Sequence, residues 1–297
     1  MLGQGPGYFG LAQSGWRLAT LLQVCQPWLK LRTLAGLWYV LYRLKIAYKR
    51  IRLHVHSPDE HYPAKRTAIQ HCLTLYKPSK TVVLFQDECT IYSKASSAGD
   101  WQARREEPRA ELGLKAQQSF PIAATLDPYS GKVVYLLRNQ FTLWAMVAFY
   151  QHLAKQYAGC QIYLIQDNWP QHSHPAVITA LESANLPFTP RLPASWAQLP
   201  AQHKYEHLHL PIYPQPLPTY ASWLNPIEKL WRWLKQDLIH KHPFTDNITG
   251  LKKAVDDWLA QFQNGSLQLL KYVGLQGTQN IYTPAIHNLF LQFPPPS

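Results

Sequence analysis

The sequence is poor in acidic residues at its start, poor in cysteine, and free of long apolar runs. No acidic residue occurs between Met1 and Ser57. The four cysteines form no CxxC pair, so we expect reduced thiols and no disulfide framework. The most apolar early stretch, Thr33 to Tyr42, spans about ten residues, whereas a membrane helix needs roughly 20. No signal peptide is evident. These shortages exclude a disulfide-rich secreted protein and predict a cytoplasmic one.

What is present points to a folded, basic protein. Apolar residues make up 46% of the 297 residues, which is enough for a substantial core. The formal net charge is +12, and +10 of it falls within residues 1–80. The rest of the chain is therefore nearly neutral. A basic N-terminal quarter predicts a polyanionic partner, with nucleic acid favoured over a membrane surface.

The N-terminal region, residues 1–56, shows two helical patterns. Apolar residues recur at three- and four-residue spacing over 16–24 and 34–44. Basic residues at the end of the second pattern and just after it are candidates for contacting DNA: Arg43, Lys45, Lys49, Arg50 and Arg52. A helix pair with a basic second member predicts a helix-turn-helix-like DNA-binding region. The alternative is an ordinary solvated basic face.

Residues 57–80 are predicted to be a linker and a connecting helix, because the polar stretch 54–66 holds two prolines and a helical pattern covers 68–76. The catalytic domain is expected over 81–265 and a C-terminal tail over 266–297. Between Pro187 and Tyr220 eight prolines make regular structure improbable, apart from a short strand expected at 186–189.

Two stretches of this predicted domain resemble each other. The apolar runs Val82–Phe85 and Ile162–Ile165 are each followed by Gln-Asp. An apolar run without alternation is typical of a strand covered on both faces. If the first strand (81–86) and the strand before Asp167 are parallel neighbours, Asp87 and Asp167 emerge at the same edge of the sheet, where open α/β sheets place their sites.

The remaining elements complete an α/β pattern. Strands at 120–126 and 132–138 are joined by a five-residue turn and predict an antiparallel hairpin. Helices are expected at three places: from a Thr142 cap to Tyr157, from a Ser173 cap to about 185, and over 247–262. This order is compatible with a ribonuclease H-like mixed sheet flanked by helices.

The stretch from Tyr220 to Lys235 carries the third acidic residue, Glu228. Asn225 is predicted to cap a helix with Pro226 in its first turn and Glu228 at the third position. One interpretation of Glu228 is a capping-box residue that bonds back to the cap. The other is a carboxylate that completes a site with the two aspartates. On the same helix, Trp231 is expected in the core and Trp233 is the better candidate for stacking on a base.

Three carboxylates at one point repel one another unless cations neutralise them. Oxygen ligands of this kind favour Mg²⁺ or Mn²⁺, and two such ions can hold a phosphodiester during displacement. Asp87, Asp167 and Glu228 are therefore candidate metal ligands and catalytic residues. Glu88 ranks below Asp87, because the two-residue period of a strand directs it to the opposite face.

These motifs resemble those of the DDE transposases of bacterial insertion sequences in the mariner superfamily. The matching stretches are Gln86-Asp87-Glu88, Gln166-Asp167-Asn168 with His172 following, and Leu224 to Trp231. Ser57-Pro58-Asp59 followed by Lys65 resembles the join between the family's DNA-binding and catalytic parts. The resemblance covers roughly residues 30–265, and the last motif is the most specific.

The resemblance implies a ribonuclease H-like domain that moves an insertion sequence by cut-and-paste. It implies a divalent-metal triad of Asp87, Asp167 and Glu228, with two ions, and it places Asn168, His172 and Asn225 near the site. Expected partners are terminal inverted repeats and target DNA with a TA dinucleotide, bound by a homodimer associated with the bacterial nucleoid. The alternatives are a DNA-binding remnant without catalysis and a nuclease without strand transfer.

Overall fold

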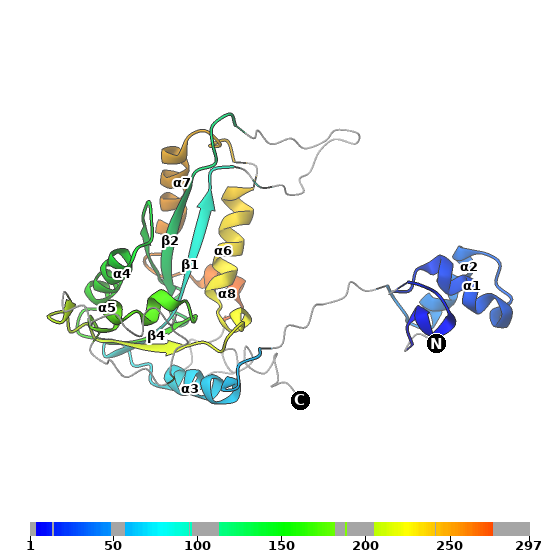
Figure 1. The fold of residues 1–297 in the computed structure, drawn as a ribbon, viewed down its shortest axis with the longest axis horizontal. Helices are drawn as coiled ribbons and strands as arrows, with labels where there is room; N and C mark the ends of the chain where they lie inside the picture. The colour runs from blue at the N-terminus through cyan, green and yellow to red at the C-terminus, as the bar shows by residue number, and fades with distance from the viewer. Residues whose placement is uncertain are drawn as a thin grey trace. The chain divides into compact units, whose positions relative to one another are not determined.

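The structure is a computed structural model that describes residues 4–13, 15–48, 57–94, 96, 113–181, 188, 205–240 and 242–275. The chain divides into two compact units, Met1–His54 and Val55–Ser297. Figure 1 draws both units. Among the described helices, none is long and apolar enough to span a membrane. All four cysteines are buried, and none of them is in a disulfide bond.

The N-terminal unit contains the two predicted helices. A 3-10 turn, η1 (Pro6–Phe9), precedes α1 (Leu18–Leu29) and α2 (Leu34–Arg43). The Thr33 side chain caps α2 by accepting a hydrogen bond from the backbone N–H of Gly36 at 3.1 Å. The buried residues that join the helices are Leu21, Cys25 and Leu37.

The predicted DNA contacts fall at the end of this unit. Arg43 is the last residue of α2, and Lys45 follows it with a left-handed backbone (φ 55°). Both side chains are exposed. Lys49, Arg50 and Arg52 lie outside the described residues. The assignment of these five residues to DNA binding therefore stays a prediction.

The second unit is built on one mixed sheet. Its strands are β1 (Thr81–Tyr92), β2 (Ser119–Leu126), β3 (Val133–Leu137), β4 (Gln161–Gln166) and β5 (Ile212–Pro216). Their order across the sheet is β3-β2-β1-β4-β5. The β1, β2 and β3 strands pair antiparallel, whereas β4 pairs parallel with both β1 and β5. The predicted hairpin and the predicted parallel pair are both confirmed.

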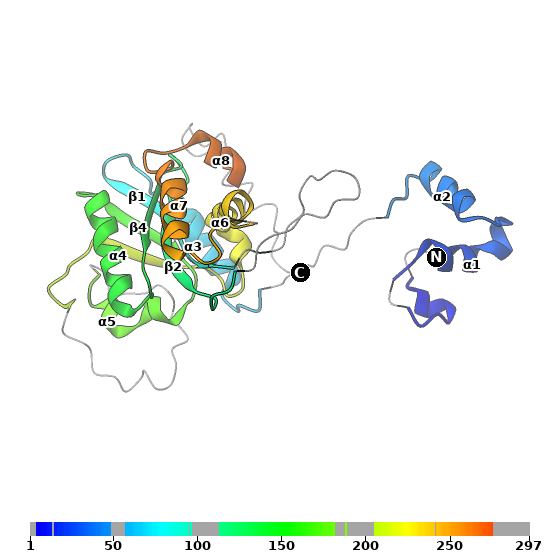
Figure 2. The same ribbon diagram turned by 90° about the horizontal axis from the view of Figure 1, so that it is seen from above.

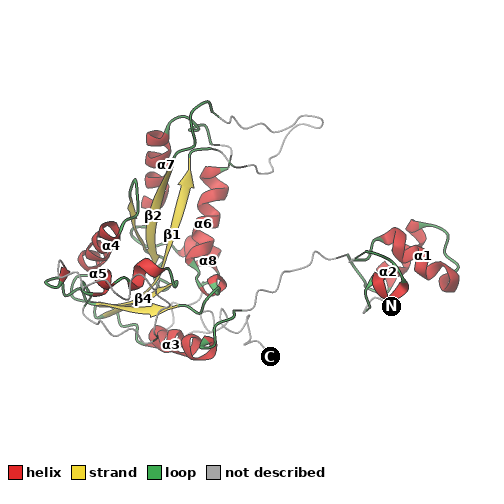
Figure 3. Cartoon of the chain, in the orientation of Figure 1, coloured by secondary structure: helices red, strands yellow, loops and turns green. Residues whose placement is uncertain are grey.

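Helices cover both faces of this sheet (Figures 2 and 3). One face packs against α3 (Tyr62–Thr74), α6 (Ile227–Leu234), α7 (Ile248–Ala260) and α8 (Leu267–Val273). The other packs against α4 (Leu143–Gln156) and α5 (Pro175–Ile178). The strands are thus covered on both sides, which explains why β1 and β4 begin as continuous apolar runs.

Alternation along β1 decides where its acidic residues point. Phe85 and Cys89 pack into the core beneath α6, whereas Leu84 packs into the core beneath α4. By the two-residue period of a strand, Asp87 faces α6 and Glu88 faces the opposite side. The predicted difference between these two neighbours is confirmed.

The extent of β1 was predicted wrongly. The strand continues past Gln86 to Tyr92, because β2 goes on pairing with it as far as Tyr92 and Ser119. Its pairing with β4 ends earlier, at Phe85 and Ile165. Asp87 therefore lies inside a strand, just beyond the point where its parallel neighbour ends.

The proline-rich stretch was predicted without regular structure, but it contains β5. The sheet order places β5 at an edge, where proline costs no interior ladder hydrogen bond. The strand expected at 186–189 lies outside the described residues except for Phe188. The extent of the helix expected from Ser173 to about 185 was predicted wrongly. His174, and not Ser173, caps α5, and this helix ends at Ile178.

Two boundaries of the second unit also differ from expectation. The α3 helix begins at Tyr62 with Pro63 in its first turn, so part of the expected linker is helical. The α8 helix, capped by Ser266, lies in the expected tail and buries Leu269 and Leu270. Because α8 packs into the core beneath α6, the folded unit extends at least to Leu275. The helix expected over 247–262 is confirmed as α7, with Asn247 as its cap.

Candidate active site

A pocket of about 590 Å³ opens where β4 ends, and Asp87, Asp167 and Glu228 all line it. Asp87 comes from the middle of β1, Asp167 follows the last residue of β4, and Glu228 lies in the first turn of α6. The remaining lining residues come from the loop after β4 and the segment between β5 and α6: Asn168, Trp169, Leu217, Pro218, Thr219, Tyr220, Ala221, Ser222 and Asn225. The fold thus brings the three predicted carboxylates to one pocket.

Asp87 is the most enclosed of the three. The indole Nε1 of Trp231 donates a hydrogen bond to its Oδ2 at 2.9 Å, so α6 holds this carboxyl group in place. Burial, together with the nearby charges of Glu228, Glu88 and Asp167, raises the pKa of Asp87 to about 8. A carboxyl group that resists ionisation among three others has no positive partner in the described part of the chain.

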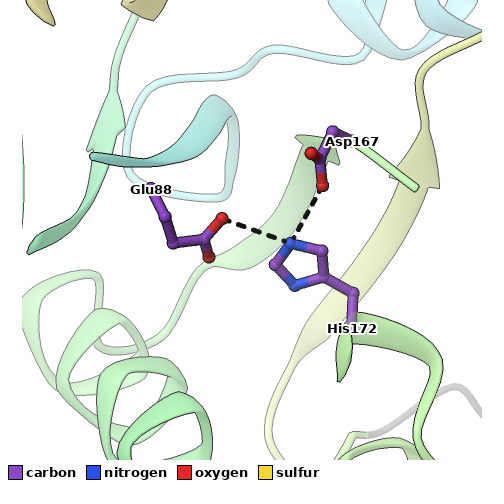
Figure 4. A group of neighbouring side chains, drawn as sticks. All are labelled: Glu88, Asp167 and His172. Carbon is purple, nitrogen blue, oxygen red and sulfur yellow. Dashed lines mark ion pairs between the residues drawn. The ribbon is translucent and has the colours of Figure 1, made fainter. Parts of the chain in front are cut away.

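Asp167 lies beside a histidine and a second glutamate, as Figure 4 shows. The Nε2 atom of His172 is 3.2 Å from Asp167 Oδ1 and 3.6 Å from Glu88 Oε2. The backbone N–H of Trp169 also donates to Asp167 Oδ1, at 2.9 Å. Although burial raises the pKa of Asp167, the contact with His172 lowers it below its ordinary value. His172 and the backbone N–H of Trp169 therefore both stabilise Asp167 in its charged form.

His172 is fully enclosed, and its ring lies between the Tyr150 hydroxyl and two carboxylates. The Tyr150 hydroxyl donates to Gln166 Oε1 at 3.0 Å, so its oxygen accepts from His172 Nδ1 at 3.3 Å. The other nitrogen faces the two carboxylates. Burial lowers the pKa of His172, but the charges of Glu88 and Asp167 outweigh it and raise the pKa to about 9.

Asn225 does not cap the helix of Glu228, contrary to prediction. Pro226 holds the N-cap position of α6, and no described side chain caps it. Asn225 is buried and instead donates from Nδ2 to the backbone carbonyl of Gln86 at 2.9 Å. This bond ties the start of α6 to β1, one residue before Asp87. The capping-box interpretation of Glu228 is therefore also wrong.

Replacing Asn225 with alanine should lower stability by about 1–3 kcal/mol, because the buried Gln86 carbonyl would lose its partner. Urea unfolding measures the change. Asn247, an exposed cap of α7, is the comparison site, where loss of the cap costs about 1 kcal/mol. A smaller loss at Asn225 than at Asn247 would contradict the tethering role.

Asn168 joins two walls of the pocket, whereas the two tryptophans of α6 pack in or against the core. Asn168 donates from Nδ2 to the Leu217 carbonyl at 2.6 Å, which joins the loops after β4 and β5. Trp231 is buried, as predicted. Trp233 packs into a cluster of rings with Trp258 and Tyr272, which gives it a core role and not the expected one of stacking on a base.

The donor set is one that a hard divalent cation fits. Glu228 joins Asp87 as a carboxyl group with a raised pKa, through burial and the charge of Asp167, against the opposing effect of Lys235 and Arg232. Oxygen donors that raise one another's pKa are stabilised by Mg²⁺ or Mn²⁺. Ligand atoms of Glu88, Asp167 and His172 also lie within 4.8 Å of one another, but the histidine supplies a positive charge there.

Comparison with known protein families settles the membership of this chain. The family model of the DDE superfamily endonucleases matches residues 82–249, more than half of the sequence. The chain belongs to the DDE superfamily of endonucleases. The matched range covers the sheet from the second residue of β1 to the end of β5, and it contains the three pocket carboxylates.

Individual proteins are also similar to this chain. An uncharacterised 39 kDa protein of the insertion element IS630 from Shigella sonnei is 23% identical over 252 residues. The match covers 84% of this chain but 65% of that relative. A crystal structure of the Mos1 mariner paired-end complex with Mn is similar with a TM-score of 0.56 at 14% identity, covering 92% of this chain and 77% of that one. A Mos1 paired-end complex with the left transposon end gives 0.50 at 15% identity, covering 92% and 79%.

Several contacts of the site were not predicted from the sequence. Glu88 reaches Asp167 and His172 although it lies on the opposite face from Asp87, because β4 ends there and leaves the edge open. Tyr150, in the middle of α4, carries no sequence signal for its contact with His172. The sequence predicted that Trp231 lies in the core, but it did not predict the hydrogen bond to Asp87. That bond depends on how α6 packs on β1.

Proposed function

We propose that this DDE endonuclease is the transposase of an insertion sequence: it cleaves DNA strands in a metal-dependent reaction and transfers the freed 3′ end to target DNA. The observation that carries the proposal is that one pocket gathers Asp87, Asp167 and Glu228 from three separate elements. The insertion-element relative and the similarity in fold to Mos1 structures support it.

Asp87, Asp167 and Glu228 are the proposed metal ligands, with two Mg²⁺ or Mn²⁺ ions as the cofactor. When bound, such ions activate an attacking water or 3′-hydroxyl and stabilise the leaving oxygen. The residues of the chain have the task of fixing the ligands. Trp231 orients Asp87, and His172 orients Asp167. Glu228 reaches the pocket from α6, whose start Asn225 ties to β1.

The proposed partners are terminal inverted repeats and target DNA, handled by a homodimer in the cytoplasm. Arg43, Lys45, Lys49, Arg50 and Arg52 would contact phosphates, which gives affinity that falls with salt. Of these, the structure describes Arg43 and Lys45, both exposed at the end of the N-terminal unit. Phosphate contacts position a protein on DNA without reading its sequence.

The test is cleavage and joining of a plasmid that carries the inverted repeats flanking the gene. Wild-type protein should cut at the repeat ends in Mg²⁺ or Mn²⁺, cut nothing in EDTA, and join the 3′ ends to a second plasmid. Salt-sensitive binding without nicking in either metal would identify a DNA-binding remnant. Cutting without joining would identify a nuclease, so both results would contradict the proposal.

A further inference from the structure

Tyr220 is an exposed aromatic residue at the rim of the pocket, held in an unfavourable backbone conformation. It lies between β5 and α6 and leaves 75% of its surface exposed. Its φ of 56° is left-handed, a region that glycine and asparagine enter more cheaply than a bulky side chain. The other described non-glycine residues with positive φ are Lys30, Lys45 and Ser79, none of them aromatic. Strain of this kind, at a pocket rim, points to a use for the ring beyond packing.

The backbone just before Tyr220 is fixed from both sides. The N–H of Thr219 donates to Asp59 Oδ2 at 2.7 Å, and the Ser57 hydroxyl donates to the Thr219 carbonyl. The Lys65 ammonium group donates to the same oxygen of Asp59 at 2.8 Å, and the Thr219 hydroxyl donates to it at 3.1 Å. The Tyr220 side chain therefore starts from a backbone that is held in place.

A second aromatic residue lines the pocket from another loop. Trp169 follows β4, and its backbone N–H donates to Asp167. Its ring packs edge-on against His172 at 5.5 Å between centroids. Each of the two loops at the rim thus places an aromatic ring beside the acidic residues. The ring of Trp169 is partly buried and held in place, whereas that of Tyr220 faces solvent.

A DNA strand needs favourable contacts at this rim. Three carboxylates repel a phosphodiester, so attraction near the pocket must come from cations and from groups that contact the bases or sugars. Aromatic rings supply such contacts, since every base has a face that stacks regardless of sequence. A base can stack on a protein ring once it is unpaired, and a strand end or a nick offers such a base.

We infer that the Tyr220 ring stacks on an unpaired base of the DNA strand that enters the pocket, next to the phosphodiester that reacts. The ring acts as a stop that sets how far the strand advances towards Asp87, Asp167 and Glu228. This inference rests on the proposed function for its substrate class. It adds a DNA contact outside the carboxylate triad.

The first test measures stacking without cleavage. The probe is a duplex with a short 3′ single-stranded overhang that carries 2-aminopurine as its last base, mixed with full-length protein in EDTA and again in Ca²⁺. Wild-type protein should quench the fluorescence of the analogue. Tyr220→Phe should retain the quench because it retains the ring, whereas Tyr220→Ala should lose it and bind the overhang about tenfold more weakly. Tyr92→Ala is the matched control, since Tyr92 is 50% exposed on the same unit and does not line the pocket.

The second test separates a DNA contact from a structural role. Tyr220→Gly should keep or raise the Tm of the DNA-free protein, because glycine relieves the left-handed backbone, and should still lose the quench. A fall in Tm with the quench retained would show a structural role and overturn the inference. So would an absent quench in wild-type protein, or an equal quench in Tyr220→Ala.

The two proposals fail in different ways. Quenching by wild-type protein that never cuts DNA in Mg²⁺ or Mn²⁺ would contradict the proposed function and leave the Tyr220 contact supported. Cleavage and quenching that are both unchanged in Tyr220→Ala would contradict the Tyr220 contact and leave the proposed function supported.

Discussion

Replacing Glu228 with glutamine is expected to reduce metal-dependent DNA cleavage roughly 100- to 1000-fold or more, while the protein stays folded. Glutamine keeps the size of the side chain and its polar end, but removes the negative charge that the proposed ions would need. No capping bond is lost, because the N-cap of α6 is Pro226 and no described side chain caps it. Rates of plasmid nicking in Mg²⁺, with Tm measured alongside, provide the test.

Asp237→Asn is the matched control for this prediction. Asp237 is an exposed acid in the π-helical turn η6 (Lys235–Ile239), which continues α6, and it does not line the pocket. Asp237 lies close to Glu228 in the sequence. The control therefore shows what the loss of one negative charge in this segment does by itself. Nicking should stay within about twofold of wild type, since exposed charges interact weakly across water. Cleavage by Glu228→Gln at the rate of the control would exclude a ligand role for Glu228.

Replacing Asp87 with asparagine should make the metal-free protein less sensitive to rising pH. The ordinary pKa of an aspartate is 3.8, and burial with neighbouring acids raises that of Asp87 to about 8. Between these two values the folded protein keeps the proton that the unfolded chain has lost. Unfolding then releases a proton, so the free energy of unfolding falls as pH rises, by at most about 1.4 kcal/mol per pH unit.

The expected difference between the two proteins is on the order of 2–4 kcal/mol between pH 5 and pH 8. Wild-type protein in EDTA should lose this stability over that range, and Asp87→Asn should not. Asparagine can still accept the Trp231 hydrogen bond through its amide oxygen, so the packing of α6 is kept. Urea unfolding at several pH values gives the free energies. Equal pH slopes for the two proteins would contradict the raised pKa.

Added Mg²⁺ should stabilise wild-type protein more than Asp87→Asn, which is opposite to the effect of rising pH. A cation that binds the folded state alone stabilises it by mass action. Because it must displace the proton of Asp87, its effect on wild type should grow towards pH 8. The raised pKa of His172, about 9, also removes stability as pH rises from 6.5 through that value. That loss is present in both proteins, and the comparison therefore isolates Asp87.

Local sequence patterns were sufficient to predict most of the second unit. The apolar runs before Asp87 and Asp167, the hairpin turn and the Thr142 cap each reflect a rule that acts over a few residues. The same holds for the inward face of α6, where Ile227, Leu230, Trp231 and Leu234 are buried. Burial and periodicity repeat along one element, so the sequence shows them directly.

Errors occurred where a segment depends on a distant partner. The extension of β1 to Tyr92 exists because β2 continues beside it. The β5 strand forms among prolines because the edge of the sheet tolerates them. Asn225 has the residue type of a helix cap, yet its amide bonds to Gln86, a residue 139 positions away. Local propensity is overridden in each case by a contact that only the folded chain provides.

The sequence by itself determined which residues can form the site: three acids in matching contexts, a helix with one buried face, and a basic N-terminal quarter. The tertiary structure decided how they meet. It placed Asp87 against Trp231, and His172 between Asp167 and Glu88. It also fixed Thr219 on Asp59, and with it the backbone next to Tyr220. The physical reason is range: side-chain chemistry and periodicity are local properties, whereas the position of a charge depends on the register of segments that meet only on folding.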